Sequence, residues 1–155
     1  MASRIVFGGL LVALFTIDLK HHRLPNALTW PGSAAGLAFS VVTEPGWRDS
    51  LLGVLVGGGA LFAFSEAYYR LRHEDGLGMG DVKMLAMIGA FIGWKLTILA
   101  FLIASCAASV VGLALLVTRR AGLKDALPFG CFLAAGAAVA ATTGPSLLEW
   151  YFRRW

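Results

Sequence analysis

Charged residues are scarce in this sequence. Only 14% of its 155 residues are Asp, Glu, Lys or Arg, whereas 58% are hydrophobic. Soluble domains average about 25% charged and about 45–50% apolar residues. The shortage of charge argues against a water-soluble domain and predicts an integral membrane protein. The net charge of +4 is too small and too scattered to indicate a nucleic-acid surface, so no nucleic-acid partner is expected.

Cysteine is equally scarce. The only two, Cys106 and Cys131, lie in separate apolar runs without a CxxC motif. A zinc site needs about four ligands at close spacing, so we expect no bound metal. Two buried, unreactive thiols are the favoured interpretation, and a disulfide between them is the alternative that the sequence leaves open.

Six apolar runs follow one another with short connections. They cover residues 5–19, 27–43, 51–69, 82–94, 96–117 and 126–148. A membrane-spanning helix needs about 20 residues, with a range of about 17–25. We therefore predict an all-α, polytopic membrane protein with six transmembrane helices, forming a single domain over residues 1–155. Lys95 is expected to mark a tight turn between the fourth and fifth spans.

The beginning of the chain resembles a signal peptide, because Arg4 precedes an apolar stretch. No cleavage site with small residues follows, and five further apolar runs come later. We therefore expect the first span to be retained.

Basic residues are distributed unevenly between the two sides of the predicted membrane. One side carries eight, namely Lys20, Arg23, Arg70, Arg72, Lys83, Arg119, Arg120 and Lys124. The other side carries five, namely Arg4, Arg48, Lys95, Arg153 and Arg154. Positively charged loops stay in the cytoplasm, so the first side is predicted to be cytoplasmic and both termini to lie outside.

Two acidic residues accompany the two shortest apolar runs. Asp18 ends the first run and Asp81 opens the fourth, so the predicted topology brings both to the cytoplasmic side. An acid at membrane depth is costly and indicates a functional site. Two close carboxylates can share one proton and activate a water molecule. The alternative is two unrelated acids at helix ends.

Glycines surround the second acid. Gly76, Gly78 and Gly80 alternate just before Asp81. Glycine permits unusual backbone conformations and close approach, so we expect an extended backbone beside the acid, to which a peptide substrate could add as a strand.

Other polar and small residues have structural explanations. Glu66 precedes Arg70 by four residues, which predicts a helical ion pair. Glycines at small-xxx-small spacing predict close helix packing; they are Gly53, Gly57, Gly58, Gly89 and Gly93.

The run Gly78-Met79-Gly80-Asp81 resembles the GxGD motif of intramembrane aspartyl proteases. Continued to Trp94, it closely resembles the type IV prepilin peptidases. Asp18 with Arg23-Leu24-Pro25-Asn26 resembles the first aspartate segment of that family, and Leu127-Pro128-Phe129-Gly130 resembles its Pro-Phe-Gly stretch. The resemblance covers all six predicted spans.

This resemblance implies an endopeptidase that removes the basic leader from type IV pilin, pseudopilin or flagellin precursors, in the inner membrane with its active site facing the cytoplasm. The catalytic residues would be Asp18 and Asp81. Residues expected to bind substrate or tune the site are Gly78, Gly80, Lys83, Glu74 and Asp75. Water would be the nucleophile, so no cofactor is expected.

Two points qualify the resemblance. The family often has Glu where Asp75 stands. Members that also N-methylate their product carry an added domain with paired CxxC motifs, so methyl transfer is not expected of this sequence.

Two other classes of protein remain open at this stage. A proton-coupled transporter or channel subunit also uses acids within the membrane. A non-catalytic scaffold of a pilus machine is the second alternative. The pattern leaves the oligomeric state undetermined, because glycine faces serve internal packing and dimers alike.

Overall fold

The computed structural model describes residues 2–21, 25–72, 78–118 and 128–153. All regular elements in these ranges are helices, which confirms the predicted all-α class. They are α1 (Ala2–His21), α2 (Asn26–Ser40), α3 (Trp47–Val54), a π-helical stretch η1 (Leu55–Gly59), α4 (Ala60–Arg72), α5 (Met79–Val117) and α6 (Phe129–Phe152). The elements α3, η1 and α4 follow one another without a break, and together they cover the third predicted span, residues 51–69.

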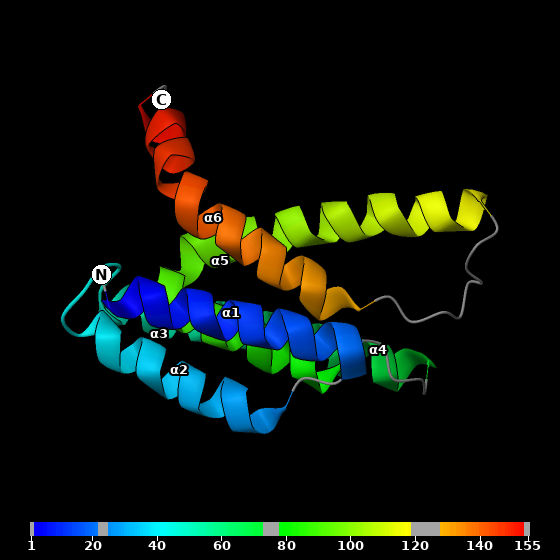
Figure 1. Cartoon of the computed structure of the whole chain (residues 1–155), viewed down its shortest axis with the longest axis horizontal. Helices are drawn as coiled ribbons and strands as arrows, with labels where there is room; N and C mark the ends of the chain where they lie inside the picture. The colour runs from blue at the N-terminus through cyan, green and yellow to red at the C-terminus, as the bar shows by residue number, and fades with distance from the viewer. Residues whose placement is uncertain (1, 22–24, 73–77, 119–127, 154–155) are drawn as a thin grey trace.

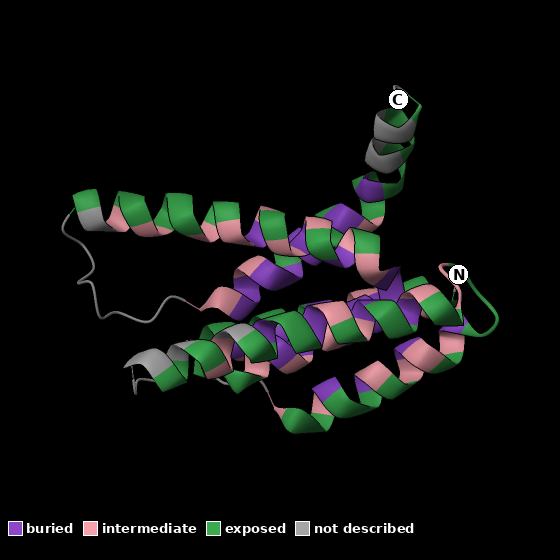
Figure 2. Cartoon of the chain, turned by 180° about the vertical axis from the view of Figure 1, so that it is seen from behind, coloured by how far each residue is buried: buried purple, intermediate pink, exposed green. Residues whose placement is uncertain are grey.

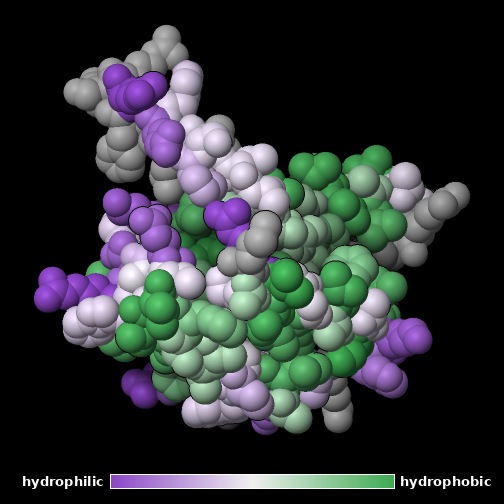
Figure 3. Space-filling view, turned by 60° about the vertical axis from the view of Figure 1, so that its left-hand side comes forward, coloured by the Kyte–Doolittle hydropathy of each residue, from purple (hydrophilic) through white to green (hydrophobic). Residues whose placement is uncertain are grey.

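Four helical segments in the described ranges are long and apolar enough to cross a membrane. They are Ala2–His21, Trp47–Ala67, Met79–Leu115 and Phe129–Ser146. Large apolar side chains also remain exposed, among them Ile5, Val12, Leu102 and Val110, and they spread over much of the surface in Figure 3. These features fit an integral membrane protein. The count of six spans stays a prediction, because α2 has only 15 residues and α5 contains two of the predicted spans.

The first half of α5 is the centre of the bundle. Met84, Met87 and Ile88 have no exposed surface, and the buried residues in Figure 2 gather around this segment. Helices α2 and α3 both pack against it. Gly53 of α3 meets Gly89 of α5 backbone to backbone, so closely that a Cβ on either would overlap the other chain segment. The predicted close packing of glycine faces is thus confirmed at this crossing.

Gly93 divides α5 into two helical segments. Its φ of 76° and ψ of 169° are not helical, and the segment after it runs back in Figure 1. A Cβ at Gly93 would lie 2.9 Å from Pro45 Cγ, so both conformation and space require glycine. The Thr97 hydroxyl donates a 2.7 Å hydrogen bond to the Gly93 carbonyl.

The turn between the fourth and fifth predicted spans therefore lies at Gly93, and its prediction at Lys95 is wrong. Lys95 was chosen because its charge marks a side of the membrane. The backbone reverses instead at Gly93, because glycine tolerates a positive φ. Gly93 was predicted to serve helix packing, and it instead serves this reversal.

Helix ends gather at two opposite ends of the bundle (Figure 1). Helices α1 and α4 end where α2, α5 and α6 begin, and we call this the carboxylate end because it contains Asp18 and Asp81. The opposite end contains Gly93, the start of α1 and the turn at Glu44–Pro45; we call it the Gly93 end.

The substitution Gly93→Ala is expected to destabilise the protein. The conformation of Gly93, with positive φ and extended ψ, is essentially confined to glycine and costs another residue about 1–3 kcal/mol, and the added methyl overlaps Pro45. The measurement is the thermal unfolding midpoint in detergent. Gly9→Ala is the matched control, because a Cβ at Gly9 meets nothing within 4 Å. An unchanged midpoint for Gly93→Ala would contradict the described geometry.

Candidate active site

Asp18 is held by the first turn of another helix. It lies in the last turns of α1 and is only 5% exposed. Its Oδ2 accepts a 3.0 Å hydrogen bond from the backbone N–H of Cys131, near the start of α6. The Cys131 thiol in turn donates to the Phe15 carbonyl oxygen at 3.6 Å. Two contacts therefore join α1 and α6 at the carboxylate end.

The start of α6 explains why this contact is favourable. The first N–H groups of a helix lack intrahelical acceptors, and the helix dipole stabilises an anion there. Pro128 precedes the helix and has no polar side chain to act as a cap, although its carbonyl accepts the Cys131 N–H at 3.1 Å. Asp18 therefore serves as an N-terminal cap that comes from a different helix.

Asp81 lies in the first turn of α5 and is half-buried. Its backbone N–H donates to the Gly78 carbonyl at 3.0 Å. A Cβ at Gly78 would lie 3.5 Å from Asp81 Oδ2, an ordinary contact. The absence of a side chain at Gly78 thus leaves space next to the carboxylate.

The expected extended backbone beside the acid is wrong for Gly80. Helix α5 begins at Met79, so Gly80 is helical and cannot pair with a substrate strand. The prediction missed this because the apolar run was counted only from Val82. The expected site residues Glu74 and Asp75, together with Gly76, lie outside the described residues.

The structure brings the two predicted carboxylates together. Asp18 and Asp81 are 63 residues apart in sequence, yet the last turns of α1 and the first turn of α5 place them at the same end of the bundle, near enough for their charges to interact. Both carboxylates also lie near enough to Cys131 to interact with its thiol electrostatically. One buried carboxylate and one half-buried carboxylate thus lie at the end of the bundle where α1 ends and α5 and α6 begin. Such a pair can hold one proton between them and exchange it with a water molecule.

Lys83 is bound to α2. Its ammonium Nζ donates a 2.8 Å hydrogen bond to Oδ1 of Asn26, the first residue of α2. The bond joins the segment that follows Asp18 to the helix that carries Asp81. Sequence reasoning named both Lys83 and Asn26 but did not pair them. Helix α2 begins at Asn26 directly after Pro25.

Cys131 is the site residue that sequence reasoning missed. Its backbone N–H binds Asp18, and because every residue except proline has such a group, the residue type does not reveal this donor. The signal was the neighbouring Pro-Phe-Gly stretch, which indicates where α6 begins. Cys131 is a buried free thiol, as predicted, but Cys106 is an exposed free thiol, so the expectation of burial is wrong there. Cys106 lies in the second half of α5, where many apolar side chains are exposed.

Two further expectations concern charge and metals. The predicted ion pair in α4 is confirmed, with Arg70 Nε 2.9 Å from Glu66 Oε1. It is exposed, so it contributes little to stability.

Among the described residues, no three His, Cys, Asp or Glu side chains form a group that could hold a metal ion. Metal-free chemistry therefore stays a prediction.

Removing the Asp18 carboxylate by two substitutions should separate its structural and chemical contributions. In Asp18→Asn, an amide oxygen can still accept the Cys131 N–H, so we expect near-normal stability. In Asp18→Ala, the cap of α6 is lost, which should cost about 0.5–2 kcal/mol. Thermal unfolding in detergent of both variants provides the measurement. Equal stability of the two variants would show that the cap contributes nothing.

Two carboxylates at the ends of apolar helices are typical of membrane proteins that have a functional site there. Comparison with known proteins identifies the family. Residues 5–113 match the model of the type IV leader peptidase family. The chain therefore belongs to the type IV leader peptidase family, as its motifs predicted.

Individual relatives agree with this assignment. Leader peptidase HopD of Escherichia coli is 44% identical over 133 residues, which cover 84% of this chain and 86% of that protein. A prepilin leader peptidase/N-methyltransferase of Aeromonas hydrophila is 33% identical over 150 residues, which cover 96% of this chain and 52% of that protein. The chain thus spans about half the length of the second relative. No solved structure matches the chain significantly.

Proposed function

We propose that this protein is an aspartyl endopeptidase of the inner membrane that cleaves the basic leader from type IV prepilin or pseudopilin-like precursors. The observation that carries the proposal is the meeting of Asp18 and Asp81 at the carboxylate end. Membership of the leader peptidase family supports the reaction. The whole domain, residues 1–155, serves to hold these two carboxylates at one end of an apolar bundle.

In the proposed reaction, water attacks the carbonyl carbon of the scissile peptide bond. Asp18 accepts the proton of the water, and the Cys131 N–H, which donates to Asp18 Oδ2, holds the carboxylate in place. Asp81 carries the shared proton and gives it to the leaving nitrogen as the C–N bond breaks. The products are a carboxylic acid and an amine, and no metal or organic cofactor takes part.

The other predicted residues serve the substrate. Glu74 and Asp75 would attract the basic leader to the site by charge. Gly78 leaves space beside the Asp81 carboxylate for the substrate backbone. Gly80 contributes no side chain to the first turn of α5, next to the acid. Lys83 positions α2 relative to α5 through Asn26.

The site is proposed to face the cytoplasm. The charge count supports this, because the carboxylate end is the side with eight basic residues against five. Labelling of single cysteines from outside the cell tests it, in a Cys106→Ser background because Cys106 is exposed. We expect Arg48→Cys, at the Gly93 end, to react and Arg72→Cys, at the end of α4, to be protected. The reverse result would invert the orientation.

The decisive test is the loss of cleavage when either carboxylate is neutralised. Asp18→Asn and Asp81→Asn should each lower the rate of prepilin cleavage by about 10³-fold. The double variant should lose little more, because groups that act as a unit are not additive. Mass spectrometry of the cleaved product measures the rate and the bond.

Asp49→Asn is the matched control, since Asp49 lies in α3 at the Gly93 end. Each variant is checked for monodispersity in detergent. A folded single variant with normal activity would exclude the dyad. Proton flux in liposomes without any cleavage would favour a transporter, and intact pilus assembly with both aspartates changed would favour a scaffold.

A further inference from the structure

A groove lies between α1 and α6 at the Gly93 end of the bundle. The two helices are joined at the carboxylate end through Cys131, and towards the Gly93 end they diverge, as Figures 1 and 2 both show. The groove has a volume of about 620 Å³, and side chains of α5 form its third wall. Sites for small molecules have volumes of about 300–1,000 Å³. The groove is therefore large enough to hold a ligand.

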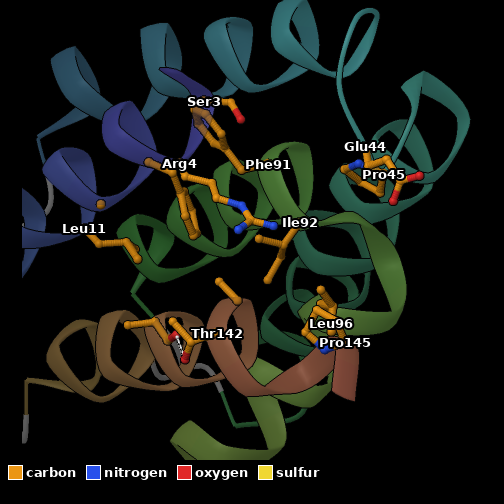
Figure 4. A pocket seen from close by; sticks show the side chains of 14 residues that line it. Ser3, Arg4, Leu11, Glu44, Pro45, Phe91, Ile92, Leu96, Thr142 and Pro145 are labelled. Carbon is orange, nitrogen blue, oxygen red and sulfur yellow. Dashed lines mark hydrogen bonds between the residues drawn. The ribbon is translucent and has the colours of Figure 1, made fainter. Parts of the chain in front are cut away.

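The groove has a charged mouth and an apolar interior. Figure 4 shows the Arg4 side chain reaching from α1 into the space between the helices, with Glu44 to one side. Most of the other lining side chains are apolar, among them Phe7, Leu11, Phe91, Leu96, Ala138 and Ala141. With a rise of about 1.5 Å per residue, Leu11 lies about 10 Å further along α1 than Arg4. The apolar interior therefore extends about 10 Å along the helices from the charged mouth.

The mouth of the groove lies at the level of a membrane surface. Helix ends gather there, and two tryptophans at the same end have cations over their rings. Arg48 Cζ lies 5.4 Å from the centre of the Trp47 ring, and Lys95 Nζ lies 5.6 Å from the centre of the Trp94 ring. Tryptophan is enriched where lipid headgroups meet the hydrocarbon core. Headgroups of bilayer lipids therefore lie beside the mouth, and their acyl chains lie beside the interior.

The two charges at the mouth are available to a ligand. Within the described ranges, Arg4 and Glu44 form no ion pair or hydrogen bond, either with each other or with another residue. Both are exposed, so a molecule outside the bundle can reach them. A guanidinium binds phosphate oxygens through two parallel hydrogen bonds, and a carboxylate accepts hydrogen bonds from an ammonium group. The groove is thus complementary to a ligand that carries both charges and an apolar chain.

We propose that this groove binds a phospholipid with an ethanolamine headgroup. The Arg4 guanidinium binds the phosphate, the Glu44 carboxylate accepts hydrogen bonds from the ammonium group, and an acyl chain lies in the apolar interior against Phe7 and Leu11. A choline headgroup has the same charges but no N–H to donate. A glycerol headgroup has no cation for Glu44. The ethanolamine lipid therefore binds more tightly than either of these lipids.

Native mass spectrometry of the protein in detergent tests the charged mouth. The probes are three phospholipids with identical acyl chains and ethanolamine, choline or glycerol headgroups. Arg4→Gln should weaken the binding of all three by about tenfold or more, because the charge-assisted hydrogen bonds to phosphate are lost. Glu44→Gln should weaken only the ethanolamine lipid, to the level of the choline lipid. Arg48→Gln is the matched control, since Arg48 lies at the same end outside the groove.

Two neighbouring positions on α6 test the apolar interior. Ala138 and Val139 are both exposed, but only Ala138 lines the groove. Ala138→Trp fills the interior and should weaken the binding of all three lipids by about tenfold or more, whereas Val139→Trp should leave it unchanged. Binding to the folded state raises the unfolding midpoint. The ethanolamine lipid should therefore stabilise the wild type and Val139→Trp against heat, but not Ala138→Trp.

The outcomes decide between occupants of the groove. Equal affinity of the wild type for the three lipids would overturn the inference, and so would normal lipid binding by Arg4→Gln. A preference for the glycerol lipid that depends on Arg4 but not on Glu44 would assign the groove to an anionic lipid instead. A dimer that Ala138→Trp dissociates, with lipid binding unchanged, would assign it to a second copy of the chain. If Ala138→Trp does not fold, the Arg4 and Glu44 variants decide alone.

These measurements concern binding and thermal stability only. Their result is independent of the proposed peptidase activity, because neither Asp18 nor Asp81 lines the groove.

Discussion

The hydrogen bond from the Cys131 N–H to Asp18 is the contact on which the carboxylate end depends. It satisfies a helix terminus that has no polar side chain of its own at Pro128, and it places a carboxylate in the field of a helix dipole. The same bond holds α1 and α6 together at one end and so fixes where the two helices diverge. The position of Asp18 and the junction of α1 with α6 therefore have a common physical origin.

The first half of α5 provides the rigid support for this arrangement. Its side chains Met84, Met87 and Ile88 are fully buried, and Gly53 and Gly89 allow α3 to cross it at backbone contact. Between lipid-exposed helices, packing and small residues replace the hydrophobic effect as the source of association. Because α5 is held on several sides, Asp81 in its first turn and Lys83 beside α2 occupy defined positions at the carboxylate end.

Much of the fold and part of the site followed from residue patterns. Long apolar runs and scarce charge indicated a helical membrane protein, and the alternation of the predicted spans placed Asp18 and Asp81 on one side of the membrane. The residue patterns did not predict the backbone conformation at two glycines. The helical state of Gly80 and the reversal at Gly93 instead of Lys95 depend on local dihedral angles and on neighbours such as Pro45, which are distant in sequence.

The sequence by itself determined that this protein belongs in a membrane, because hydropathy decides whether a segment can be buried in lipid. It also determined which side chains are able to carry a proton, because that property depends on residue type alone. Only the tertiary structure decided which backbone groups bind those side chains. The Cys131 donor, the pairing of Lys83 with Asn26 and the groove between α1 and α6 arise from the angles at which helices cross. Crossing angles depend on packing summed over many residues, and no single motif encodes that sum.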